Sequence, residues 1–84
     1  MNNKYFSRNK SSSNFVFAFA QELKQYMEEN ADRFDRDVWD SLNYWRSGIL
    51  SQGIITDEDL SEIIDYIGLE KLQELISIAS SKSA

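Results

Sequence analysis

The sequence contains no cysteine, no histidine and no proline, and it has only three glycines in 84 residues. Without cysteine there is no disulfide, no thiolate nucleophile and no cysteine-ligated metal, and a cytoplasmic location is favoured because small secreted domains usually depend on disulfides. Without histidine the chain lacks the commonest general base and the commonest ligand for transition metals. The shortage of helix-breaking residues, together with many Leu, Ile, Glu and Lys residues, favours long helices.

Long hydrophobic runs and catalytic motifs are also missing. No stretch approaches the ~20 apolar residues of a membrane-spanning helix, and the six-residue apolar run at 15–20 is too short for the core of a signal peptide. Neither the GxxxxGKS/T nor the GxGxxG phosphate-binding pattern occurs, and without histidine there is no Glu-x-x-His metal motif. We therefore predict a protein that is not an enzyme, binds no cofactor or metal and does not associate with membranes.

Charge is distributed unevenly along the chain. The first 14 residues hold three bases and no acid, whereas the other 70 hold all 14 acids against six bases. Because the first 13 residues also lack apolar periodicity, we predict a flexible basic arm at 1–13 and a single acidic helical domain at 14–84. An acidic body repels phosphate, which argues against nucleic acid as the partner of the folded part.

Apolar residues recur at helical spacing in four segments, approximately 15–30, 32–52, 57–67 and 69–80. The connections are short, so we predict an all-α fold, a compact four-helix bundle, with a fifth helix if the second segment breaks near Gly48. The predicted core faces consist of Val16, Phe19, Ala20, Leu23, Tyr26, Met27, Phe34, Val38, Leu42, Trp45, Ile49, Leu60, Ile63, Ile64, Ile67, Leu69, Leu72, Leu75, Ile76 and Ala79.

The start of the third segment carries the clearest local signal. The Thr56 hydroxyl is placed to accept a hydrogen bond from the Asp59 amide, as the N-cap of a helix does. Asp59 occupies the position where Glu or Gln would complete a capping box, although its shorter side chain is expected to reach back less well. Gly68 is placed to end this helix.

Several apolar residues fall outside the core stripes: Phe17, Trp39, Leu50, Tyr66 and Ile78. Trp and Arg are enriched at the centres of protein interfaces. We therefore predict a partner-binding or homodimer surface on the side of the second helix that carries Trp39 and Arg46. Alternatively, a small bundle packs imperfectly and such residues belong to wide core stripes or lie singly in solvent. The residues of this candidate surface are Trp39, Asn43, Arg46 and Leu50.

A second candidate surface is acidic. The third and fourth segments are rich in carboxylates and contain a single base, Lys71. This pattern predicts a negative surface that meets a basic protein face, or simply a solvated helix exterior whose first turn suits the helix dipole. Its candidate residues are Glu58, Asp59, Glu62, Asp65, Tyr66, Glu70 and Glu74.

The basic arm is a third candidate. Three cations and two neighbouring aromatic rings could contact phosphate and stack on a base, although so few charges give a weak and salt-sensitive site. The alternative is a tail that only improves solubility. The residues concerned are Lys4, Tyr5, Phe6, Arg8 and Lys10.

These patterns lead to one preferred function and two alternatives. We predict a small acidic adaptor or regulator that acts by protein–protein interaction or homo-oligomerisation. The first alternative is an acidic inhibitor that occupies the basic nucleic-acid site of a target, since in size and charge the chain is similar to the small acidic helical immunity and inhibitor proteins of bacteria and phages. The second is a weak nucleic-acid binder that uses the arm.

Overall fold

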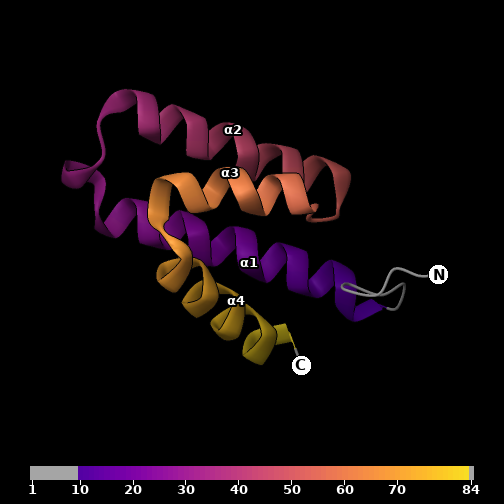
Figure 1. The fold of residues 1–84 in the computed structure, drawn as a ribbon. Helices are drawn as coiled ribbons and strands as arrows, with labels where there is room; N and C mark the ends of the chain where they lie inside the picture. The colour runs from indigo at the N-terminus through magenta and orange to yellow at the C-terminus, as the bar shows by residue number, and fades with distance from the viewer. Residues whose placement is uncertain (1–9, 84) are drawn as a thin grey trace.

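The computed structural model describes residues 10–83, which form four α-helices and no strand. The helices are α1 (Lys10–Glu29), α2 (Arg36–Gln52), α3 (Asp57–Ile67) and α4 (Leu69–Ser83), with a short 3-10 helix η1 (Ala31–Arg33) between the first two. Consecutive helices run in alternating directions; α1 packs against both α2 and α4, and α3 runs alongside α2 (Figure 1). The predicted all-α four-helix bundle is confirmed.

Helix α1 begins at Lys10, five residues before the predicted start. The segment 10–13 of the predicted arm is therefore helical. Serine is a weak helix former, but no proline or glycine interrupts this segment, and adding turns to an existing helix costs much less than starting one. The remaining arm residues, 1–9, lie outside the described part of the chain.

Helix α2 begins later than predicted, because the chain first turns through η1. The Asp35 carboxylate caps the helix by accepting a hydrogen bond from the Val38 amide at 3.0 Å. The residue before this cap, Phe34, packs its ring edge-on against Tyr26 of α1, with the centroids 5.8 Å apart. The helix then continues through Gly48 without the break that this glycine allowed, because tertiary packing outweighs intrinsic propensity.

Helix α3 has the predicted boundaries and the predicted cap. The Asp59 amide donates to the Thr56 hydroxyl at 3.1 Å, and the Thr56 amide donates to the Asp59 carboxylate at 2.9 Å. The expectation that the aspartate would reach back less well is therefore wrong, and both orphan amides are satisfied.

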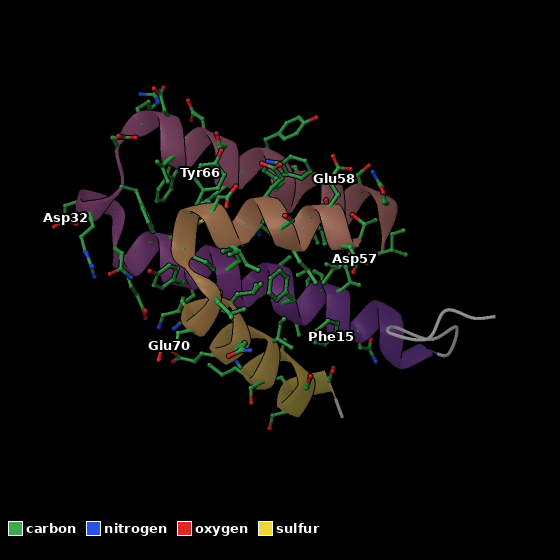
Figure 2. The ribbon with its side chains drawn as sticks, viewed as in Figure 1. Phe15, Asp32, Asp57, Glu58, Tyr66 and Glu70 are labelled. Carbon is green, nitrogen blue, oxygen red and sulfur yellow. The ribbon has the colours of Figure 1, made fainter. Side chains whose placement is uncertain are left out.

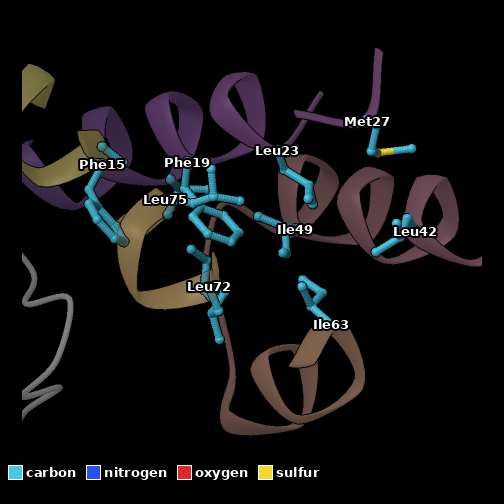
Figure 3. Packing of buried hydrophobic residues seen from close by; sticks show 12 residues of the cluster. Phe15, Phe19, Leu23, Met27, Leu42, Ile49, Ile63, Leu72 and Leu75 are labelled. Carbon is cyan, nitrogen blue, oxygen red and sulfur yellow. The ribbon is translucent and has the colours of Figure 1, made fainter. Parts of the chain in front are cut away.

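The core runs through all four helices (Figure 3). Its most deeply buried large side chains are all predicted core residues: Phe19, Leu23, Met27, Leu42, Ile49 and Ile63. The prediction for Leu69 is wrong, since its side chain is 55% exposed. Gly68 directly precedes Leu69 and, with φ of 88°, changes the direction of the chain. Leu69 therefore lies at the outer corner between α3 and α4.

Candidate functional site

Arg46, one of the predicted interface residues, links α2 to α1 by a hydrogen bond. Its guanidinium Nε donates a hydrogen bond of 2.8 Å to the main-chain carbonyl of Ala20, which is buried on α1. A charged donor on a partly buried carbonyl makes a stronger hydrogen bond than a neutral one. Arg46 therefore links the two antiparallel helices at this level, and part of its hydrogen-bonding capacity is used within the protein.

The other three members of this predicted surface differ in their surroundings. Trp39 is half-buried against the core and lines an open groove of 410 Å³ at the corner between α1 and α2. Asn43 is half-buried, whereas Leu50 is 38% exposed. The structure thus places all four residues on the α1-facing side of α2, and among them Leu50 offers the most accessible large apolar side chain.

Two further large apolar side chains are exposed. Phe17 is 58% exposed and Ile54 is 50% exposed. Because Arg46 contacts Ala20 and the helices are antiparallel, Leu50 lies one turn further along α2 and Phe17 one turn earlier along α1, which brings them to neighbouring levels.

Ile54 follows Gly53 directly, in the connection between α2 and α3. We call Phe17 and Leu50 the α1–α2 apolar edge. The sequence indicated both as apolar residues outside the core stripes, whereas the exposure of Ile54 was not predicted; its signal was an apolar residue just after a helix-ending glycine, outside every core stripe.

The α3 residues of the predicted acidic surface fall into two groups, those that are used within the fold and those that face solvent. Asp59 is buried in the capping box, and Tyr66 packs its ring against the core. Glu58 and Asp65 are exposed and Glu62 is half-buried. Within residues 10–83 these last three carboxylates form no salt bridge, so they retain their charge toward solvent and partners.

The acidic residues of α4 lie elsewhere. Figure 2 shows Glu70 at the start of α4, near the opposite end of α3 from Glu58. Glu70 and Glu74 line an open groove of 760 Å³ that also includes Lys71 and Tyr26. Lys71 Nζ donates to the Glu74 carboxylate at 2.8 Å and lies 4.9 Å from the centroid of the Tyr26 ring.

The hydrogen bond to Glu74 raises the pKa of Lys71 above 10.5. The charge of Glu74 is therefore partly compensated by its neighbour. The predicted acidic residues of α3 and α4 thus form two separate surfaces. They do not form one continuous row of carboxylates.

Sequence reasoning missed an ion pair between a buried glutamate and a mostly exposed lysine. Glu22 of α1 is 8% exposed, and its carboxylate accepts a hydrogen bond from Lys82, near the end of α4. A buried carboxylate needs such a partner because burial removes its hydration. The available signal was weak: a glutamate adjacent to the core stripe of α1, with nothing in the sequence to indicate a partner 60 residues away.

The candidate arm lies almost entirely outside the described residues. This applies to Lys4, Tyr5, Phe6 and Arg8, while Lys10 is the first residue of α1. In the part that the structure describes, no three carboxylates converge as metal ligands, and no helix is long and apolar enough to cross a membrane.

Comparison with known proteins gives no match. No protein-family model, no curated protein and no solved structure resembles the chain significantly. The surfaces described above are therefore the only structural indication of function within residues 10–83.

Proposed function

We propose that this protein is a non-enzymatic adaptor or regulator that binds another protein through the α1–α2 apolar edge. The observation that carries this proposal is the exposure of Phe17, which is 58% accessible on α1 at a level neighbouring that of the exposed Leu50 on α2. Large apolar side chains grouped on a surface favour an interface, because covering them removes apolar area from water at about 25 cal/mol per Å².

The surroundings of this edge also suit binding. The shared core and the hydrogen bond from Arg46 join α1 to α2, so Phe17 and Leu50 are presented by two helices that are already packed against each other. A preorganised surface loses little conformational freedom on binding. Aromatic and aliphatic anchors with an arginine beside them are typical of the residues that dominate binding energy in protein interfaces.

The test is a comparison of two variants with the wild-type protein. The double variant Phe17→Ser with Leu50→Gln should lose bound protein in affinity capture from the source cells, and any self-association seen by sedimentation should fall with it. Leu69→Gln is the matched control, since Leu69 is a large apolar residue with 55% exposure at a different site. All variants should keep the helical circular dichroism of the wild type.

The proposal fails if the double variant captures the same proteins with the same yield as Leu69→Gln and associates with itself to the same extent. Trp39 is left unchanged in this design, because it packs against the core and its loss would also affect stability.

The acidic-inhibitor alternative is less well supported. A mimic of nucleic acid needs carboxylates that follow one another over an extended surface, whereas Asp59 is used in a cap and Glu74 is paired with Lys71. Its test is salt dependence: capture by the α1–α2 apolar edge should survive high salt, and capture by a row of carboxylates should not. The nucleic-acid alternative predicts that deleting residues 1–13 abolishes binding to single-stranded nucleic acid.

A further inference from the structure

A third groove lies where α2 meets α3, on the side of α2 opposite to Leu50. It is open, has a volume of 310 Å³ and is separate from the α1–α2 apolar edge. Its lining combines aromatic, small polar and acidic side chains, mainly Tyr44, Trp45, Gly48, Ser51, Gln52 and Asp59.

Two aromatic rings form one wall of this groove. Tyr44 is 71% exposed, and its ring meets the Trp45 ring edge-on, with centroids 5.4 Å apart and an angle of 88° between the ring planes. In this geometry the two ring faces point in different directions, and each face carries the negative side of the ring quadrupole. An exposed tyrosine beside a half-buried tryptophan is suited to a cation.

Gly48 is one of the residues that line this groove. A Cβ atom added to this glycine would meet no other atom within 4 Å, so the space above it is free. This glycine costs helix stability and no turn requires it, since it lies inside α2. Gly48 therefore leaves room for a side chain from another molecule.

The charge around the groove is negative. From Arg46 to Lys71 the chain has six acids and no intervening base. Asp59 lines the groove. Glu58 directly precedes Asp59 in α3, and Glu62 follows Asp59 by about one helical turn. These two carboxylates belong to the group that forms no salt bridge within residues 10–83.

We propose that the α2–α3 groove receives a lysine or arginine side chain from a basic segment of a partner protein. The cation lies against Tyr44 and Trp45, its charge is balanced by Glu58 and Glu62, and its aliphatic stem covers Gly48. Both the aromatic wall and the absence of bases favour a cationic side chain over an apolar one. This site goes beyond the proposed function, because it lies on the other side of α2 from Phe17 and Leu50.

Nuclear magnetic resonance on the full chain tests the proposal directly. The probe is a short acetylated and amidated peptide of alternating glycine and arginine, and the same peptide with glutamate in place of arginine is the control. The chain has two tryptophans, so the indole N–H signal of Trp39 serves as an internal reference for that of Trp45. The arginine peptide should shift the signals of Trp45 and Gly48 in a saturable way and leave that of Trp39 unchanged.

Three variants sharpen the test. Tyr44→Ser should weaken binding about fivefold or more, because one cation–π contact is lost. Gly48→Gln should abolish it by filling the groove in a helix that glutamine favours, so this loss cannot be attributed to unfolding. Glu62→Gln should weaken binding more than Glu70→Gln, which removes the same charge at a distant place.

The proposal is overturned if Gly48→Gln binds the arginine peptide as well as the wild type, or if Glu62→Gln and Glu70→Gln have equal effects, since either result would indicate unspecific charge attraction. The Phe17→Ser, Leu50→Gln variant should bind this peptide normally. Loss of binding here and loss of binding at the α1–α2 apolar edge are thus distinguishable.

Discussion

Replacing the three glycines by alanine allows a prediction in which steric clashes play no part. A Cβ atom added to Gly48, Gly53 or Gly68 would meet no atom within 4 Å. Replacing each glycine by alanine therefore changes only the backbone energetics. Gly48 lies in the interior of α2, whereas Gly53 and Gly68 have positive φ angles of 74° and 88°.

The expected signs follow from these angles. Gly48→Ala should increase the free energy of unfolding by about 0.8–1 kcal/mol, the difference between alanine and glycine in a helix interior. Gly53→Ala should reduce it by about 1–2 kcal/mol, because Gly53 adopts the left-handed helical conformation. Gly68, with ψ of 155°, lies in a region that is almost reserved for glycine, so Gly68→Ala should cost the upper part of a range of ~1–3 kcal/mol.

Thermal and urea unfolding followed by circular dichroism measures these differences. For a domain of this size, 1 kcal/mol corresponds to about 4–8 °C in Tm. Gly53→Asn is a useful control, since asparagine tolerates the left-handed conformation and should lose less stability than alanine. The reasoning is refuted if Gly48→Ala destabilises the protein, which would mean that α2 is broken at this residue, or if Gly68→Ala is as stable as the wild type.

Three further predictions concern the cap and the two ion pairs. Thr56→Ala should lower the free energy of unfolding in urea by about 1 kcal/mol, because the capping box loses its acceptor; no change would argue against the box. Lys82→Met should cost roughly 1–3 kcal/mol because it leaves the Glu22 carboxylate buried without its partner, and adding Glu22→Leu should recover part of this loss in a double-mutant cycle. The raised pKa of Lys71 contributes stability that is complete below pH 10.5 and is lost as the pH rises through the higher folded-state value. The stability difference between wild type and Glu74→Gln should therefore shrink above pH 10.5, and a constant difference would contradict the assignment.

Much of the fold could be predicted because it depends on neighbours in the chain. The bounds and cap of α3 require only Thr56, Asp59 and Gly68, which act within one turn of the helix ends. The start of α2 could not be placed in this way. Asp32 and Asp35 are both acceptable near a helix start, and the choice of Asp35 depends on how Phe34 packs against α1.

The candidate surfaces were only partly predictable for the same reason. Helical spacing correctly placed Arg46 and Leu50 on one side of α2, but it could not show that this side faces α1. The sequence did not predict the α2–α3 groove, because Tyr44 lies outside the core stripe of its own helix. Only the packing of α3 against α2 brings Asp59 to the same groove as Tyr44 and Gly48.

The sequence by itself determined the helical class, the main core residues and the cap of α3, because hydrophobic periodicity and hydrogen bonds between near neighbours act locally. Only the tertiary structure decided the roles of Arg46, Glu22 and Leu69. The carbonyl that binds Arg46 is 26 residues away and the lysine that pairs with Glu22 is 60 residues away. Such contacts depend on how whole helices pack, and the spacing of residues within one helix contains no information about the residues of another.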